Sequence, residues 1–508
     1  MGTPAPAAQY RRRTLDPLIA GSVLLLVLFV LLATIIDITM VRSALFLLQD
    51  RIVENFAWFF SLTVTMLLGF AAWLACSRHG ALGIGPDDCK PEFGMIAWLS
   101  MLFSAGMGIG LVFYGVAEPV LHYLNPPNAQ AETAAAAREA MRLSVFHWGL
   151  HAWGIYAVLG LALALFHFRY DQPLALRSVL LPLLGKQTHR WPGKLVDMLA
   201  VLGTLFGLAT SLGLGATQIN AGLALLFGIG MSSGAQTAII VIVTACATLS
   251  LVLGLHKGIR RLSEANLLLA LLLLLFVLFL GPTATLLRGI TDTLGNYLQS
   301  LMGMSLSSHP FRSLDWQKSW TIFYWAWWLA WAPFVGMFIA RISRGRTLRE
   351  FVVGVLVMPS VMSLLWFGVF GGAALQVALQ GDVALAQAVQ QDAAVAIYNL
   401  LGHYPLSSVT ALLAMLLVVV FFITSSDSGS FVVDMLCSGG NPNPPLWQRI
   451  FWALLEGVVA VTLLRIGGLN ALQAGVVSLG LPFCLVLVAA SWCLYRQLQT
   501  EVQAMTAV

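Results

Sequence analysis

The stretch WTIFYWAWWLAWAPFVGMFIARISRGRT, residues 320–347, decides how the rest of the chain is interpreted. Because a helix turns by about 100° per residue, a helix over 319–340 would gather four rings on one side: Tyr324, Trp327, Trp328 and Trp331. Trp320 and Trp325 instead fit the aromatic belt where a helix crosses the membrane surface. Nearer the middle of a span, an indole N–H needs a partner or a water-filled cavity. Ring faces of this kind can bind a quaternary ammonium, which has no N–H to donate.

The composition is that of a membrane protein. Of 508 residues, 59% are hydrophobic and only 10% are charged, and the mean hydropathy is +0.86. Twelve apolar runs are long enough to cross a bilayer: 17–40, 54–76, 94–121, 143–168, 196–228, 235–254, 263–281, 320–340, 351–376, 408–436, 447–465 and 470–495. The longest gap between them, 282–319, is too short for a separate catalytic domain. The spans hold no nucleophile–base pair and the six cysteines show no metal-ligand spacing, so we expect no enzyme.

Basic residues indicate the orientation. The segments on the side of the N-terminus carry 19 Lys and Arg, and those on the opposite side carry 8. Because cytoplasmic loops are enriched in Lys and Arg, both termini are predicted to be cytoplasmic, which is consistent with an even number of spans. The net charge of +5 follows from this topology, so no nucleic-acid partner is expected.

The third run contains an unusual set of glycines, SAGMGIGLVFYGVAEP at 104–119. Gly106, Gly108 and Gly110 alternate, so they would not share one helical face, and each lowers helix propensity by about 1 kcal/mol relative to Ala. We therefore expect an unwound segment whose free N–H and C=O groups line a site inside the membrane. Its amides could bind a carboxylate and its carbonyls a sodium ion.

Two further runs carry polar or aromatic clusters. In FHWGLHAWGIY, 146–156, the rings of Trp148, Trp153 and Tyr156 fall within about 140° of helical arc. His147 and His151 have the i, i+4 spacing of a zinc pair, but we expect a structural role because no carboxylate or Cys accompanies them. The preceding segment, 131–143, is predicted to be a short helix on the outer surface. In FFITSSDSGS, 421–430, four hydroxyls and a carboxylate indicate an ion or a buried pair with Arg.

The order of the runs suggests an internal repeat. Runs three to seven and eight to twelve form two sets of five, and equivalent members would cross the membrane in opposite directions. The glycine-rich run and the Trp-rich run, which Pro333 interrupts, each come first in their set. The predicted organisation has five parts: 1–92, a tail and two peripheral spans; 93–281, the first repeat; 282–319, a periplasmic amphipathic connector; 320–497, the second repeat; and 498–508, a short cytoplasmic tail.

Four motifs, at 106–119, 146–156, 320–347 and 421–430, resemble those of the betaine/choline/carnitine transporter family. The resemblance follows the motif order over nearly the whole chain. It implies an all-α, LeuT-like fold of ten core helices preceded by two extra ones. It also implies a homotrimer in the lipid of the bacterial inner membrane, and transport of a small quaternary ammonium solute with sodium as the coupling ion and no other cofactor.

The resemblance also assigns residues. An aromatic box around a trimethylammonium group corresponds to Trp148, Trp153, Tyr156 and Trp328. Neighbouring rings along the path correspond to Trp325, Trp327 and Trp331. From the glycine spacing itself, we expect the amides around Gly106, Gly108 and Gly110 to face the substrate carboxylate. The sodium site corresponds to the backbone of Ser104, Met107 and Phe421 and the side chains of Thr424 and Ser425. A second sodium site retains Thr204 and Phe334, but Leu208 stands where the family has a threonine.

Several functions remain open from the sequence. Sodium symport of glycine betaine is expected first. Proton-coupled choline carriers of the family tend to have an acidic residue where Gly110 stands, and the sodium-independent carnitine exchanger has an Arg at the position of Leu267. Proton-coupled or exchange transport of choline, carnitine or a sulfonium analogue is the alternative within the class. A channel or a sensor with an aromatic cage is the alternative from another class.

Overall fold

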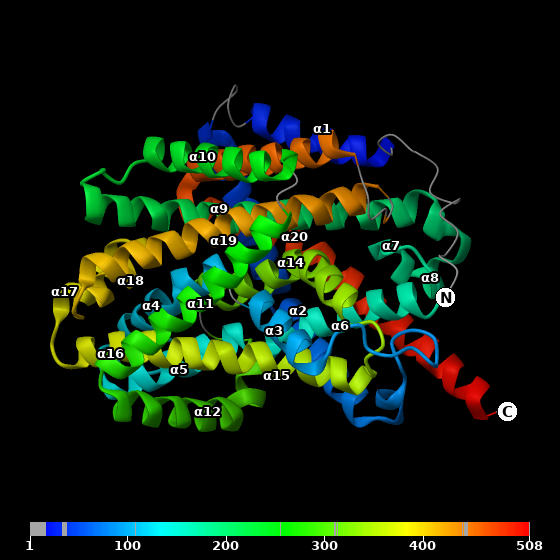
Figure 1. Cartoon of the computed structure of the whole chain (residues 1–508), viewed down its shortest axis with the longest axis horizontal. Coiled ribbons are helices and arrows are strands. Elements are labelled where there is room, and N and C mark those ends of the chain that lie inside the picture. Colours follow the sequence, from blue (N-terminus) through cyan, green and yellow to red (C-terminus); the bar gives the residue numbers. More distant parts are fainter. Residues whose placement is uncertain are drawn as a thin grey trace.

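The computed structural model is built almost entirely of helices (Figure 1). It describes residues 17–32, 38–106, 108–253, 256–308, 311, 313–438, 440 and 445–506. Within these ranges, the β-structure is limited to an isolated antiparallel bridge between Gly83 and Thr347.

The helices up to the connector follow the predicted order. They are α1 (Pro17–Leu31), α2 (Ile38–Cys76), η3 (Arg78–Ala81), α3 (Met95–Gly106), α4 (Ile109–Leu124), α5 (Ala134–Trp148), α6 (Leu150–Phe168), α7 (Leu176–Val179), α8 (Leu181–Leu184), η4 (Gly185–His189), α9 (Trp191–Phe227), α10 (Ser233–Val252) and α11 (His256–Leu280). The predicted connector contains α12 (Thr283–Ser305) and α13 (Asp315–Ser319). The four buried residues of α12, Leu286, Thr293, Tyr297 and Ser305, share one face, as expected for an amphipathic helix.

The second set begins with the Trp-rich helix. It comprises α14 (Thr321–Ile342), α15 (Leu348–Trp366), the π-helical turn η5 (Phe367–Gly371), α16 (Gly372–Leu379), α17 (Val383–Gln391), η6 (Ala393–Val395), α18 (Ala396–Leu401), α19 (Ser407–Cys437) and α20 (Leu446–Thr506). Figure 1 shows α10 along the upper edge and α12 along the lower edge, with α14 and α6 between them.

Nine helices in the described part of the chain are long and apolar enough to cross a membrane. The prediction of twelve spans differs from this number at three places. Within the described residues the first run begins with a 15-residue helix, too short to be counted, and the third run is divided into α3 and α4. In α20, predicted spans eleven and twelve are joined across Gly467 and Gly468, where the backbone leaves the helical region (φ −170° and +60°). The count of twelve stays a prediction.

Helix α14 occupies the core. Of its 22 residues, 18 are buried, and it packs against α6, α9 and α20. Glycines allow the closest approach: a Cβ atom on Gly160 of α6 would lie 3.2 Å from the carbonyl oxygen of Gly336 of α14. This contact brings the rings of the two helices to a common cavity.

The structure corrects two sequence predictions. The segment 131–143 does not form a short surface helix: most of it belongs to α5, which is largely buried and continues into α6 after a bend at Gly149. Its alanines present little side-chain bulk, so α5 can pack closely against α4. Trp325 is not an interfacial anchor, because only 1% of its surface is exposed and its ring stacks on His151 inside the molecule.

Candidate functional site

A cavity of about 690 Å³ lies among α3, α4, α6, α11, α14 and α19. Its lining includes Phe93, Gly108, Gly110, Trp148, Trp153, Tyr156, Glu264, Trp328, Trp331, Phe421, Thr424 and Ser425. The cavity therefore collects residues from all four sequence motifs. It runs from the rings of α6 and α14 to Phe93, just before α3, and Glu264, in the third turn of α11.

The four rings of the predicted aromatic box all line this cavity. The rings of Trp148 and Trp328 meet edge to face, with 4.9 Å between centroids. The ring of Tyr156 lies between those of Trp153 and Trp328, with centroid distances of 5.3 Å and 6.5 Å respectively. All four side chains are at least 93% buried, so a cation among them would have lost its water. Such a cation would interact with each suitable ring face by about 1–2 kcal/mol.

Two of the three indole N–H groups of the box are held by specific acceptors. Trp328 donates to the carbonyl oxygen of His147 at 2.9 Å, and Trp148 donates to Oε2 of Glu118 at 2.9 Å. The hydroxyl of Tyr324 donates to the same Glu118 oxygen at 2.5 Å. Because their polar edges point away from the cavity, the ring faces are left for a ligand.

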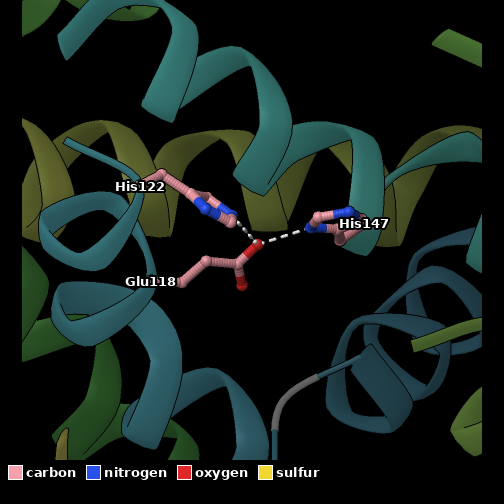
Figure 2. A group of neighbouring side chains, drawn as sticks. All are labelled: Glu118, His122 and His147. Atoms are coloured by element: carbon pink, nitrogen blue, oxygen red, sulfur yellow. Dashed lines mark hydrogen bonds and ion pairs between the residues drawn. The ribbon is translucent and has the colours of Figure 1, made fainter. Parts of the chain in front are cut away.

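Glu118 is the functional candidate that sequence analysis missed. Figure 2 shows its carboxylate between two imidazoles: Oε1 lies 2.7 Å from Nδ1 of His147 and 3.3 Å from Nε2 of His122. Together with Trp148 and Tyr324, four side chains from α4, α5 and α14 converge on this fully buried carboxylate. A carboxylate inside an apolar span is costly unless it has a role, and that was the available signal.

These same groups also meet the spacing for a metal site. Ligand atoms of Glu118, His122 and His147 lie within 4.8 Å of one another. Hydrogen bonds account for the arrangement without an ion, because Oε2 is taken by two donors and His147 Nε2 lies 3.0 Å from the hydroxyl of Thr321. His151 turns elsewhere, to the hydroxyl of Ser305 at 2.8 Å, so His147 and His151 do not form a zinc pair.

The backbone break predicted in the glycine-rich run is present. Helix α3 ends at Gly106, Gly108 is fully extended (φ −167°, ψ 179°), and α4 begins at Ile109. No side chain caps α4, so its first N–H groups are not used within the helix. Gly108 and Gly110 line the cavity, which places the positive end of α4 at its wall. A Cβ on Gly110 would lie 2.8 Å from the rings of both Trp148 and Trp327, so only glycine fits there.

Three predicted sodium ligands, Phe421, Thr424 and Ser425, line the cavity together with Gly108. The Thr424 hydroxyl donates to the carbonyl oxygen of Val420 at 2.9 Å, which leaves its lone pairs for a cation. These oxygen donors suit a hard cation, so the residues present fit the group that the resemblance implies. Met107 and the side chain of Ser104 lie outside the described residues.

The remaining predicted residues divide into two groups. Trp327, Trp331 and Phe334 line the cavity. Trp325 and Thr204 do not. Trp325 packs against Phe146 and His151, whereas Thr204 is fully buried with no hydrogen-bond partner for its hydroxyl among the described residues. The structure thus does not bring Thr204 to the cavity with Phe334.

The polar cluster at the middle of α19 has an Arg partner, one of the two explanations that its sequence suggested. Arg449 of α20 lies 3.9 Å from the carboxylate of Asp427, and both side chains are mostly buried. The guanidinium of Arg449 also lies over the ring of Phe431, at 5.1 Å from its centroid. Leu267, at the position where the carnitine exchanger has Arg, lines the cavity as a neutral side chain.

Comparison with known proteins identifies the family. The profile described as BCCT, betaine/carnitine/choline family transporter, matches residues 17–503. The chain belongs to this family of multi-pass membrane transporters. A glycine betaine transporter of Acinetobacter baylyi is 46% identical over 462 residues, which cover 91% of this chain and 70% of the relative. The glycine betaine transporter OpuD of Bacillus subtilis is 46% identical over 456 residues, 89% of this chain and 88% of the relative.

Another relative has a different printed substrate. The high-affinity choline transport protein of Escherichia coli K12 is 43% identical over 456 residues, which cover 89% of this chain and 67% of that protein. Solutes with a quaternary ammonium are therefore common to these relatives, whereas the group at the other end of the solute differs between them.

Proposed function

We propose that this protein imports a trimethylammonium compatible solute, glycine betaine first, by sodium symport through alternating access. The observation that carries the proposal is the cavity that joins four aromatic rings to an uncapped helix end and the hydroxyls of α19. A trimethylammonium group would sit among Trp148, Trp153, Tyr156 and Trp328. Its tethered carboxylate would reach the first amides of α4, around Gly108 and Gly110.

The carboxylate end distinguishes glycine betaine from choline. An anion gains from the free N–H groups and the positive end of α4, whereas the neutral hydroxyl of choline gains less. Gly110 supplies no negative charge that would favour a purely cationic solute. Choline remains the second candidate, because the E. coli relative carries it and the same box would accept its ammonium.

Sodium would bind between Phe421, Thr424 and Ser425 and the broken run that contains Ser104 and Met107. An ion there supplies positive charge that holds the two parts of the site together, which favours the substrate-bound arrangement. A second sodium ion at Thr204 and Phe334 would require those residues to approach each other in another state of the transport cycle.

The position of the cavity supports an inward-facing state. It reaches Phe93 and Glu264, next to loops predicted to be cytoplasmic. Beyond the opposite end of the box, Glu118 binds Trp148, and the rings of His122 and Trp320 pack with 4.3 Å between centroids. In the other state of alternating access, the contacts around Glu118, His122 and Trp320 would open, and the end of the cavity near Phe93 and Glu264 would close.

The proposal includes the arrangement expected from the sequence. Twelve spans would form two inverted repeats of five, preceded by two peripheral helices. The protein would be a homotrimer in the bacterial inner membrane, with both termini in the cytoplasm. Choline, carnitine or a sulfonium analogue driven by protons or exchange is the alternative, and a channel or sensor is the alternative of another class.

Uptake into proteoliposomes tests the function. Full-length protein is reconstituted, and labelled glycine betaine is supplied with an inward sodium gradient, an inward proton gradient, or neither. Accumulation above equilibrium with the sodium gradient alone is expected. Accumulation driven equally by protons contradicts sodium symport, whereas flux that never exceeds equilibrium under any gradient contradicts secondary active transport. Unlabelled choline, carnitine and a sulfonium analogue, added as competitors, rank the alternative solutes.

A further inference from the structure

A second buried carboxylate, that of Glu456 on α20, has no role in the site above. Its side chain is fully buried. The hydroxyl of Ser426 on α19 lies 3.5 Å from Oε2, and Ser430, one turn further along α19, is also within hydrogen-bonding reach. Oε1 has no partner, and no Lys, Arg or His in the described part of the chain forms an ion pair with Glu456. In the described part of the chain, the polar partners of this carboxylate are thus hydroxyls.

This environment differs from that of two other carboxylates inside the molecule, Glu118 and Asp427. Glu118 receives four donors, and Asp427 faces Arg449. An ionised carboxylate with neither a counter-charge nor a full set of donors is strongly disfavoured in a low-dielectric interior. Glu456 must therefore hold a positively charged partner, and a covalently bound proton is the smallest.

The hydroxyl of Ser430 helps to decide whether Glu456 is protonated. It donates to the carbonyl oxygen of Ser426 at 2.6 Å, so its only hydrogen is already used. That hydrogen is therefore not available to the Glu456 carboxylate. An ionised carboxylate has no hydrogen to donate, whereas a protonated one does. The geometry favours the neutral acid over a sodium carboxylate, which would need several more oxygen ligands.

The surroundings contain few other charges. The face of α19 toward this region continues from Ser426 and Ser430 to Asp434, which is fully buried with neither carboxylate oxygen bonded to a described residue. Arg449, on the same helix as Glu456, acts electrostatically on Asp434 and lies near Asp427. Helix α10, which packs against α19 and α20, has no charged residue, and its Thr244 approaches Gly457.

The link to transport is the turn of α19 that Glu456 contacts. Ser426 directly follows Thr424 and Ser425, which line the cavity at the proposed sodium site. A change at Glu456 would therefore act on the same turn from its opposite side. Movement of α19 relative to α20 would alter access of water to the carboxyl group.

We propose that Glu456 is a proton-binding site inside the membrane, separate from the sodium site, which holds its proton while α19 packs on α20 and releases it to water when the two helices separate. The step is a simple dissociation: the carboxyl O–H bond breaks, the electron pair stays on the carboxylate, and water takes the proton. The inference concerns a different group from the solute site and does not depend on which solute is carried.

Infrared difference spectroscopy of the full-length protein in lipid tests this directly. The carbonyl stretch of a protonated carboxyl is separate from the bands of an ionised one. At neutral pH we expect such a band in the wild type, loss of one component of it in Glu456→Gln, and retention of that component in Asp434→Asn and in Glu501→Gln. Glu501 is the matched control because it forms two hydrogen bonds of 3.0 Å with Arg169 and is thereby held ionised. A band that persists unchanged in Glu456→Gln overturns the proposal.

Two further measurements separate the remaining explanations. Ser426→Ala keeps the carboxyl but removes its neighbour, so it should shift the Glu456 band without abolishing it; an unshifted band assigns the signal to another group and contradicts the proposal. Addition of sodium at fixed pH should leave the band in place. If sodium removes it, Glu456 binds sodium rather than a proton. Because these readouts do not require uptake, failure of the proposed transport function would leave them interpretable.

Discussion

The indole of Trp328 makes three contacts with its neighbours at the cavity wall. Its ring and that of Trp148 meet edge to face. It stacks on the ring of Trp327 with 4.9 Å between centroids, and its N–H donates to the carbonyl oxygen of His147. Its free surface faces the cavity. Substrate affinity at this site should thus depend on aromatic character and not only on bulk.

Replacement of Trp328 by Leu should therefore weaken binding of glycine betaine by about five- to thirtyfold, the equivalent of one lost cation–π contact of about 1–2 kcal/mol. Titration of intrinsic fluorescence, with uptake as a second readout, measures the change. Trp492→Leu is the matched control, because Trp492 is 45% exposed and lies outside the cavity. Unchanged affinity in Trp328→Leu would show that the box is wrongly assigned.

Glu118 positions Trp148 rather than contacting the cavity. In Glu118→Gln one oxygen becomes an NH₂ group, which must face donors from His147 and His122 or from Trp148 and Tyr324. Loss of a buried charged hydrogen bond costs about 1.5–3 kcal/mol, so binding should weaken by about ten- to hundredfold. Glu54→Gln, at an exposed position of α2, should bind as the wild type does. Equal affinities for the two variants would leave Glu118 without a positioning role.

At the scale of elements, the start of α4 must come very close to the box. A methyl group on Gly110 would lie 2.8 Å from carbon atoms of Trp148 and Trp327, closer than nonbonded atoms approach. Gly110→Ala should therefore displace both rings and reduce the affinity for glycine betaine at least tenfold. Gly295→Ala, on α12 with open space around it, is the control and should bind normally. The result would contradict the account if both alanine variants bound equally well.

A surface ion pair joins the start of α17 to the residues after α18. His403 Nε2 lies 2.7 Å from Asp382, and Nδ1 lies 2.9 Å from the carbonyl oxygen of Asn399. Burial alone lowers the pKa of His403, but the hydrogen bond to Asp382 outweighs it and the net pKa is raised. The same hydrogen bond lowers the pKa of Asp382.

The sign of the pH dependence follows from these two shifts. The raised His403 pKa gives stability that is complete below the unfolded value of about 6.5 and is lost as the pH rises through the folded value. The lowered Asp382 pKa gives stability that is present above about 3.9 and is lost in stronger acid. The melting temperature of His403→Asn should therefore fall furthest below wild type near pH 5–6, and the two should converge at alkaline pH. A constant difference would exclude the pair as the cause.

Parts of this fold could be predicted from sequence and others could not. The break after Gly106 followed from alternating glycines, and the gathering of Tyr324, Trp327 and Trp328 followed from helical periodicity. Both depend on residues near one another in the chain. The partners of Glu118 could not be predicted, because Trp148 and Tyr324 lie 30 and 206 positions away. The bend at Gly149 and the π-helical turn at 367–371 likewise depend on tertiary packing.

At the scale of the molecule, the cavity is formed by helices from both halves of the chain. Trp153 and Tyr156 come from α6, Trp328 from α14 and Thr424 from α19. Solute and ion would therefore be held between two groups of helices, as a carrier that changes access by relative movement of those groups requires. The exposed apolar side chains of α2, α10 and α11 would face lipid.

The central claim is that the box recognises a positive charge surrounded by methyl groups, and not merely a shape. Equilibrium binding of glycine betaine and of 3,3-dimethylbutanoate tests it directly, because the second compound replaces the nitrogen by carbon with the same outline and the same carboxylate. Four rings at about 1 kcal/mol each predict that this isostere, which lacks the positive charge, binds at least a hundredfold more weakly. Binding of the two compounds with equal affinity would contradict a cation–π site at Trp148, Trp153, Tyr156 and Trp328.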